Sequence, residues 1–323
     1  MPNVVCTEHV SMTALQHAVE SLFDERNGTG LTLAVVVMVE GEIVAEKYGP
    51  TAGPDVTLIS WSMAKSITHA LVGLLVGDGL LDVSRPVSVP EWQGDLRREI
   101  TLQHLLNMSS GLRFLEDYVD AGVSNCIEML FGSGSDDVAG YAASLPLDHV
   151  PNSVFNYSSG TTNIICRLAS DVLGGGEPEL REYLAHRLFG PLGMVRAEPR
   201  FDAAGTFIGS SFVYATAREF ARFGELYRND GCVGGERLLP LGWVEHARTP
   251  APAPIPSGER GYGAHWWLWP ERSAFAAQGY EGQRIVVVPG ASATIVRLGK
   301  TAAADGPALD TALTHLIDLV SSG

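Results

Sequence analysis

Strand-like segments lie at the two ends of this chain, and helical segments fill most of the middle. Near the start, the apolar run Leu31–Val39 and the segment Glu42–Tyr48 flank a tight turn at Glu40 and Gly41, which predicts a hairpin. Near the end, four short segments return to a period of two and predict four more strands, at 262–269, 275–279, 284–288 and 293–298. We therefore predict one antiparallel sheet that is assembled from both ends of the chain.

The middle of the chain has helical periodicity, interrupted by glycine-rich loops. Helices are predicted at 102–108, 163–173, 180–188 and 216–228, and two further helices flank the strand segments at 12–25 and 309–320. The predicted fold class is α+β, an α/β sandwich in which residues 1–85 and 255–323 form the sheet and its flanking helices. Residues 86–254 are expected to form an inserted all-helical domain, with a cleft between the two parts.

Composition narrows the partners that we expect. The net charge of −15 argues against nucleic acid or an anionic membrane surface, because both are bound through clustered Lys and Arg. The start of the chain lacks a secretory signal pattern, and the apolar run 31–39 is too short to span a bilayer. Four scattered cysteines, without CxxC spacing, indicate thiols in a reducing compartment. We expect a cytoplasmic protein that needs neither a metal ion nor a cofactor.

Lys65 stands out because most basic residues of this chain are arginines. The chain has three lysines and nineteen arginines, yet Lys65 occurs in the nearly uncharged run 60–75. Ser62 precedes it by three residues, so the two side chains share one face if the run is helical. A desolvated lysine can lose its proton and act as a base, which arginine cannot do. The alternative is a lysine whose stem packs on the core while its amine reaches solvent.

Two further segments carry polar groups at the edges of predicted elements. Tyr157 lies in the polar turn Phe155–Gly160, immediately before a predicted helix. Its ring could instead cap the core while its hydroxyl stays in water. The segment Ala277–Gln283 ends one late strand and opens the next, and its two glycines would let backbone approach a ligand closely. An ordinary hairpin turn would also explain these glycines.

Taken in order, these segments resemble the motifs of the serine β-lactamase and penicillin-binding protein superfamily. Ser62-Met63-Ala64-Lys65 matches the S-x-x-K motif, Tyr157-Ser158-Ser159 matches the Y-x-N or Y-x-S motif, and Gly279-Tyr280-Glu281-Gly282 falls where the third motif lies on an edge strand. The segment 101–112 is similar to the helix and loop before the second motif. The resemblance covers essentially the whole chain. It is strongest to the class C β-lactamase-like hydrolases, which include esterases and 6-aminohexanoate-dimer hydrolases.

The resemblance implies a role for each matching residue. Ser62 would be the nucleophile, Lys65 its general base, and Tyr157 the general acid and base for the leaving group and the deacylating water. The backbone N–H groups of Ser62 and Tyr280 would form the oxyanion hole. The residues that we expect to bind substrate are Ser159, Gly279, Gly282, Asp117, Tyr118 and Trp266. A solvated acidic loop is the alternative for 117–118, and only half of the strand 266–269 is expected to face the cleft.

Departures from the family pattern affect the expected substrate. Ala277 occupies the position where β-lactamases and peptidases have a Lys or His that helps to bind the substrate carboxylate. Ser159 replaces the Asn of class C enzymes, and no Glu-centred deacylation motif of the class A type is present. Lys65 is then expected to be the only catalytic cation in the cleft. These changes weaken the case for β-lactams or D-Ala-D-Ala peptides.

The expected function is therefore a serine hydrolase that cleaves a small amide or ester through an acyl-enzyme on Ser62. The nearest alternative is an acyltransferase on the same scaffold, because both reactions share the acyl-enzyme. A β-lactamase or D-Ala-D-Ala peptidase is a further alternative. A binding protein that keeps the fold without turnover is disfavoured, because Ser62, Lys65 and Tyr157 are all present.

Overall fold

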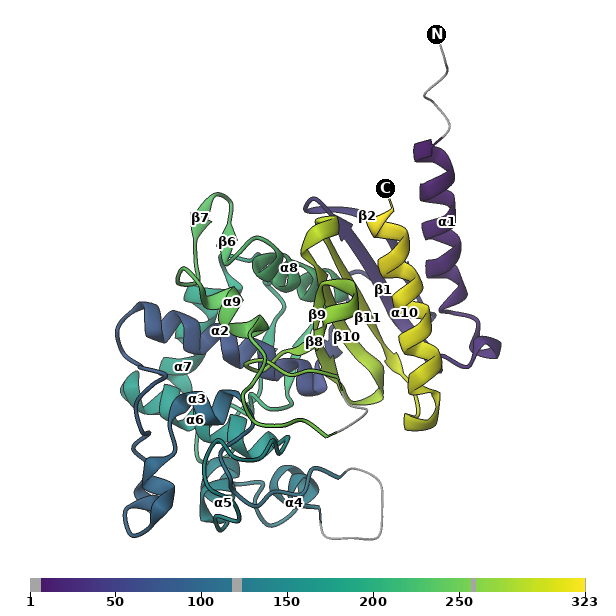
Figure 1. Cartoon of the computed structure of the whole chain (residues 1–323). Helices are drawn as coiled ribbons and strands as arrows, with labels where there is room; N and C mark the ends of the chain where they lie inside the picture. Colours follow the sequence, from purple (N-terminus) through teal and green to yellow (C-terminus); the bar gives the residue numbers. More distant parts are fainter. Residues whose placement is uncertain (1–6, 118–123, 257–259, 323) are drawn as a thin grey trace.

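A six-stranded antiparallel sheet forms the centre of the molecule (Figure 1). The computed structural model describes residues 7–117, 124–256 and 260–322, with side chains from Thr13 onward. The strand order is β2-β1-β11-β10-β9-β8. Their bounds are Glu42–Tyr48 for β2, Leu31–Val39 for β1, Ala293–Lys300 for β11, Gln283–Val288 for β10, Ala274–Gly279 for β9 and Trp267–Trp269 for β8. Because β1 pairs with β11, the two ends of the chain meet inside one sheet, as predicted.

The residues of β1 alternate between two hydrophobic cores, one on each face of the sheet. Val35 and Val37 are buried in a cluster with residues of α1 (Thr7–Ser21) and α10 (Gly306–Ser321). Val36 belongs to the larger cluster on the opposite face, which includes residues of α2 (Ala64–Gly77) and α8 (Ala217–Arg228). Successive side chains of a strand point to opposite faces, so a strand that is apolar throughout is buried on both sides. Figure 1 shows α1 and α10 side by side on one face of the sheet.

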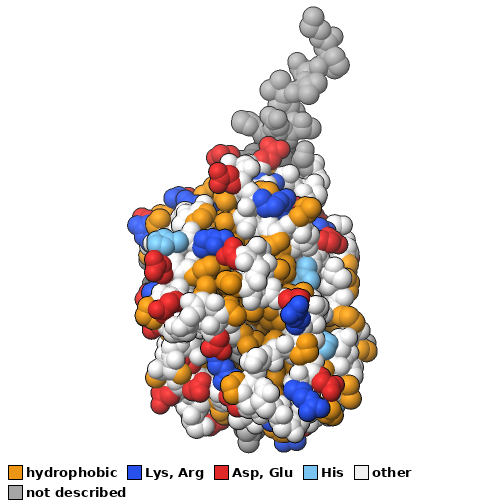
Figure 2. All heavy atoms as spheres, turned by 90° about the vertical axis from the view of Figure 1, so that its left-hand side faces the viewer, with side chains coloured by type: hydrophobic (Ala, Val, Ile, Leu, Met, Phe, Trp, Pro, Cys, Tyr) orange, Lys and Arg blue, Asp and Glu red, His pale blue; other side chains and the backbone are white. Residues whose placement is uncertain are grey.

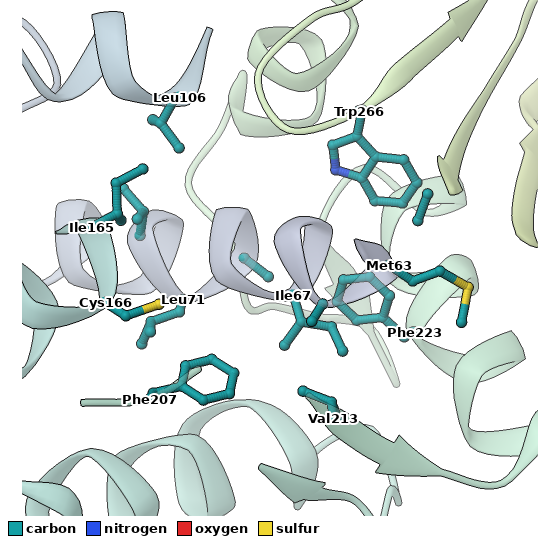
Figure 3. Close-up of a cluster of buried hydrophobic side chains, with 14 of the residues drawn as sticks. Met63, Ile67, Leu71, Leu106, Ile165, Cys166, Phe207, Val213, Phe223 and Trp266 are labelled. Carbon is teal, nitrogen blue, oxygen red and sulfur yellow. The ribbon is translucent and has the colours of Figure 1, made fainter. Parts of the chain in front are cut away.

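Helix α2 lies in the middle of the larger core, where residues 64–75 are all buried. In the close-up of Figure 3, Met63, Ile67 and Leu71 line one side of this helix and its preceding turn. The side chains around them come from widely separated parts of the chain, among them Leu106, Ile165, Cys166, Phe207, Val213, Phe223 and Trp266. A helix that is apolar around most of its circumference is typical of a core element. It gives the residues at its N-terminus a rigid support.

The remaining helices surround α2. They are α3 (Leu102–Leu106), α4 (Asn125–Phe131), α5 (Val138–Ser144), α6 (Ser159–Val172), α7 (Glu177–Leu184) and α9 (Trp243–Arg248). The predicted helices 102–108, 163–173, 180–188 and 216–228 correspond to α3, α6, α7 and α8. Helices α4, α5 and α9, which span six or seven residues, were not predicted.

The middle of the chain also contains short strands, so it is not entirely helical. These are β4 (Glu198–Pro199), β5 (Val213–Ala215), β6 (Cys232–Val233) and β7 (Glu236–Arg237). Strand β3 (Leu58–Ile59) pairs with β5, so this small sheet crosses the expected boundary at residue 85. Strands of two or three residues show no alternation that a sequence pattern could reveal.

The surface mixes charges of both signs. On the face shown in Figure 2, acidic and basic side chains are interspersed among apolar ones. Within the described ranges, no helix is long and apolar enough to cross a membrane.

Candidate active site

Ser62 lies in a short 3₁₀ turn, Trp61–Met63, that leads directly into α2. Trp61 has a φ of 42°, in a region that bulky residues adopt only when the surrounding structure enforces it. Lys65 lies in the first turn of α2 and is 1% exposed. Its Nζ is 3.0 Å from Ser62 Oγ. The spacing of three residues therefore places the two side chains in hydrogen-bond contact.

Lys65 has two further hydrogen-bond partners in addition to Ser62. Its Nζ lies 2.9 Å from Ser159 Oγ and 3.0 Å from the carbonyl oxygen of Ser210. The Ser210 carbonyl can only accept a hydrogen bond, and Ser62 Oγ can either donate or accept. A neutral amine has two N–H bonds and one lone pair. Ser159 Oγ and Ser210 O can accept hydrogen bonds from the two N–H groups. The lone pair of the amine is then available for the hydroxyl proton of Ser62.

Glu116 fixes the orientation of the Ser159 hydroxyl. The Ser159 Oγ–H donates to Glu116 Oε1 at 2.5 Å, and the Ser159 backbone N–H donates to Glu116 Oε2 at 2.7 Å. With its proton committed to the carboxylate, Ser159 Oγ must accept from Lys65. The sequence analysis did not identify Glu116. The contact spans 43 residues, and no local spacing signals it.

Tyr157 is held at the N-terminus of α6 by its two neighbours. Ser158 caps the helix by accepting a hydrogen bond from Thr161 N at 3.0 Å, and Asn156 N donates to Met108 O at 2.7 Å. Lys65 Nζ lies 4.8 Å from the centroid of the Tyr157 ring. Burial raises the pKa of the Tyr157 phenol. Tyr157 is thus a phenol at neutral pH and can give up a proton.

Gly279 lets the end of β9 approach the turn that carries Ser62. A Cβ on Gly279 would lie 2.4 Å from the carbonyl oxygen of Ser60, closer than any side chain could tolerate. The next residue, Tyr280, packs its ring edge-on against Trp61, with 5.8 Å between the centroids. Glycine at 279 therefore allows the backbone of Tyr280 to come alongside Ser62.

These groups open onto a cavity of about 320 Å³, which we call the polar cavity. It is lined by Ser62, Glu116, Tyr157, Trp267, Gln278, Gly279, Tyr280 and Arg284. Arg284 belongs to β10, opposite Gln278 of β9. Arg284 therefore adds a cation at the cleft that the sequence analysis did not identify, and Lys65 stays the only cation that we expect to act in catalysis. Ala277 itself is 1% exposed and faces the core.

Trp266 is not a cleft residue, and this prediction is wrong. It is fully buried against Tyr227 and Phe275, at centroid distances of 4.4 and 5.1 Å. The cleft is lined by its neighbour Trp267. The predicted strand 262–269 forms only from residue 267, because the backbone turns at His265, where φ is 58°.

Three other predicted substrate-binding residues lie away from the cavity wall, and one cannot be placed. Gly282, with a φ of 80°, packs against Leu309 and Arg297, beneath the surface. Ser159 is 1% exposed and contacts Lys65 rather than the cavity. Asp117 is exposed, and its carbonyl oxygen accepts a hydrogen bond from Ser124 Oγ. Tyr118 lies outside the described residues. Of the predicted substrate-binding residues that the structure describes, only Gly279 lines the polar cavity.

The described residues contain no candidate metal-binding site. Within those ranges, no group of three or more His, Cys, Asp or Glu side chains is placed to hold an ion.

Comparisons with known proteins identify the family and the fold. A 6-aminohexanoate-dimer hydrolase from Paenarthrobacter ureafaciens is 28% identical over 288 residues, which cover 83% of this chain and 72% of the relative. A family VIII carboxylesterase has the same fold, with a TM-score of 0.72 at 16% identity over 97% of this chain and 99% of that one. A class C β-lactamase has a TM-score of 0.70 at 14% identity, over 100% of this chain and 99% of that one. The family model described as Beta-lactamase matches residues 19–317, and the chain therefore belongs to the β-lactamase family of serine hydrolases.

Proposed function

We propose that this protein hydrolyses a small amide or ester through an acyl-enzyme on Ser62. The observation that carries the proposal is the set of three contacts around Lys65 Nζ. Two of them, to Ser159 Oγ and Ser210 O, can take up the N–H bonds of a neutral amine, and the third is Ser62 Oγ at 3.0 Å. This arrangement points the lone pair of the amine at the proton that must leave the nucleophile.

In the proposed acylation step, Ser62 Oγ forms a bond to the acyl carbon as its proton moves to Lys65 Nζ. Backbone N–H groups of Ser62 and Tyr280 stabilise the developing oxyanion, and the loss of one such donor typically lowers kcat by about 10²- to 10³-fold. The bond to the leaving group then breaks. Tyr157, whose ring lies 4.8 Å from Lys65 Nζ, protonates the leaving atom and recovers a proton from Lys65.

Deacylation uses the same groups in reverse. As the water oxygen attacks the ester carbon, Tyr157 accepts a proton from the water and passes its own phenolic proton to Lys65 Nζ, and Lys65 then gives that proton to Ser62 Oγ as the ester bond breaks. A positioned acid or base of this kind typically contributes about 10²- to 10⁴-fold to the rate. We assign Glu116 a positioning role, because it accepts hydrogen bonds from both the hydroxyl and the backbone N–H of Ser159. Its negative charge also offsets the ammonium that forms on Lys65 during acylation.

The test is to trap the acyl-enzyme and follow its fate. Rapid mixing with an activated ester, followed by acid quench and intact mass, should show one added acyl group that disappears as water hydrolyses it. Added amines or alcohols should leave the decay rate unchanged. A decay that accelerates in proportion to the added acceptor would instead identify an acyltransferase, and the absence of any adduct would contradict the proposal.

A further inference from the structure

A second cavity meets the polar cavity at Ser62. It measures about 170 Å³, and its wall is formed mainly by Trp61, Ile127, Leu130, Phe131 and Tyr280. We call it the apolar cavity. The two cavities share Ser62 and Tyr280 and no other lining residue. The nucleophile therefore stands between two spaces of different character.

The wall of the apolar cavity carries no charged side chain among the described residues. Cys126 contributes a thiol whose pKa burial raises, so this group is neutral at physiological pH. Ser211 is 3% exposed. Apart from Ser62, the described wall is therefore formed mainly by aromatic and aliphatic side chains.

Helix α4 leaves large apolar side chains exposed beside this cavity. Phe131 is 59% exposed and Ile127 is 40% exposed, and both line the cavity. Phe131 also contacts Phe212, with 6.0 Å between the ring centroids, and Phe212 lies 5.8 Å from Trp61. Exposed apolar groups that gather around a hollow mark a binding surface more often than chance. The exposure of α4 is thus explained if an apolar group enters between these side chains.

The geometry of the tetrahedral intermediate decides which part of the substrate enters; this step rests on the proposed function. The acyl carbon carries four substituents in the intermediate: Ser62 Oγ, the oxyanion, the leaving group and the acyl chain. The oxyanion is directed to the N–H groups of Ser62 and Tyr280. The leaving group must face its proton donor Tyr157, which lines the polar cavity and not the apolar one. The remaining direction is the apolar cavity.

We propose that the apolar cavity is the acyl-group site, and that the substrates are esters or amides of compact hydrophobic acids with polar leaving groups. An apolar cavity of about 150 Å³ in another protein holds one benzene molecule, so a cavity of about 170 Å³ fits an acyl group of roughly six carbons. The polar cavity suits a polar leaving group, because Glu116, Gln278 and Arg284 line it.

The experiment compares acyl chains of increasing length on one leaving group. With p-nitrophenyl acetate, butanoate and hexanoate, kcat/KM should rise about threefold to fourfold for each buried methylene. It should stay high for the benzoate and fall at least tenfold for the decanoate, which exceeds the cavity. A profile that is flat from acetate to decanoate would overturn the proposal.

Ile127→Trp supplies the matching variant, because residue 127 lies on the exposed side of α4 and a larger side chain there fills the cavity from its rim. It should lower the ratio of kcat/KM for the hexanoate and the benzoate to kcat/KM for the acetate at least tenfold. Val195→Trp, at a position that is 79% exposed and outside both cavities, should leave this ratio unchanged. An equal loss for every acyl group in Ile127→Trp would contradict the proposal.

Two controls separate this inference from the proposed function and from the opposite orientation. Labelling of Ser62 by a fluorophosphonate tests the nucleophile alone; a labelled Ser62 with a flat acyl profile would overturn only the acyl-site proposal. Failure to label Ser62 would overturn the proposed function. In a series of alkyl acetates, in which only the alcohol lengthens, Ile127→Trp should change kcat/KM by the same factor for every member. Sensitivity to the alcohol instead of the acid would place the leaving group in the apolar cavity and refute the assignment.

Discussion

The hydroxyl of Ser159 donates a 2.5 Å hydrogen bond to Glu116 while it receives one from Lys65 at 2.9 Å. This pair connects a carboxylate at the cavity wall to the amine beside the nucleophile. It gives the lysine a fixed orientation, in the way that an acidic residue orients the histidine of a catalytic triad. Ser159 occupies a position where the class C enzymes carry an amide, and Glu116 gives its smaller side chain a directional role.

Glu116→Gln should lower kcat by about ten- to hundredfold, because a hydrogen bond to a charged group is worth about 1.5–3 kcal/mol. The amide can accept only one of the two bonds from Ser159 and presents a donor to the other. The pH dependence of kcat should shift as well, since the charge beside Lys65 is lost. Glu182→Gln, at a side chain that is 73% exposed, is the control. A variant with wild-type kcat and an unchanged pH profile would refute the positioning role.

Lys65→Arg should reduce kcat/KM by about 10²- to 10⁴-fold, the typical contribution of a positioned base. Arginine keeps the positive charge but has no lone pair to accept the Ser62 proton. Steady-state kinetics on an activated ester provide the measurement, with circular dichroism to verify the fold. Rates near those of the wild type would show that Lys65 acts only through its charge.

Trp266 and Trp267 are neighbours with opposite roles, and alanine substitutions should separate them. Trp266→Ala should lower the free energy of unfolding by about 3–5 kcal/mol, the usual cost of removing a fully buried Trp. Trp267→Ala should cost about 1 kcal/mol, because it loses mainly aromatic contacts with Tyr157 and Tyr262. It should raise KM instead. Urea denaturation and steady-state kinetics of both variants provide the measurement. If Trp266 lined the cleft, Trp266→Ala would raise KM with little loss of stability.

His265 should make the stability of the fold depend on pH. Burial lowers its pKa to about 3, while the unfolded chain titrates near its reference value of about 6.5. Between these values only the unfolded state binds the proton, so the stability is present above pH 6.5 and is lost as the pH falls toward 3. The loss amounts to at most about 1.4 kcal/mol for each pH unit.

The matched variant is His265→Asn, because Asn tolerates the positive φ of this position. The difference in unfolding free energy between wild type and variant should shrink from pH 6.5 to pH 5, as measured in urea. A difference that is constant over this range would mean that His265 titrates alike in both states.

The sequence was sufficient for the features that depend on local spacing. Ser62 and Lys65 share a face because three residues separate them, and the period-two segments at both ends of the chain form one sheet. Two kinds of feature were not predicted: which residues of a strand face the core, and contacts between residues that are far apart in the sequence. The sequence indicated that half of the segment 266–269 would face the core, but it did not indicate that Trp266 is buried and Trp267 lines the cleft.

Long-range contacts explain the other omissions. Glu116 reaches Ser159 from a loop with no periodic pattern, and Arg284 lines the cavity because β10 pairs with β9 in a particular register. Neither residue stands in a motif. The cation that is missing at Ala277 therefore has a counterpart on the adjacent strand, which the pattern of a single strand could not indicate.

The most direct test of the account is the site of covalent labelling. The protein is incubated with a fluorophosphonate and analysed by intact mass and peptide mapping, in parallel with Ser62→Ala. The account predicts one adduct, on Ser62, that forms at least about 10²-fold more slowly in Lys65→Arg and is absent from Ser62→Ala. An adduct that persists in Ser62→Ala, or that maps to another residue in the wild type, would contradict it.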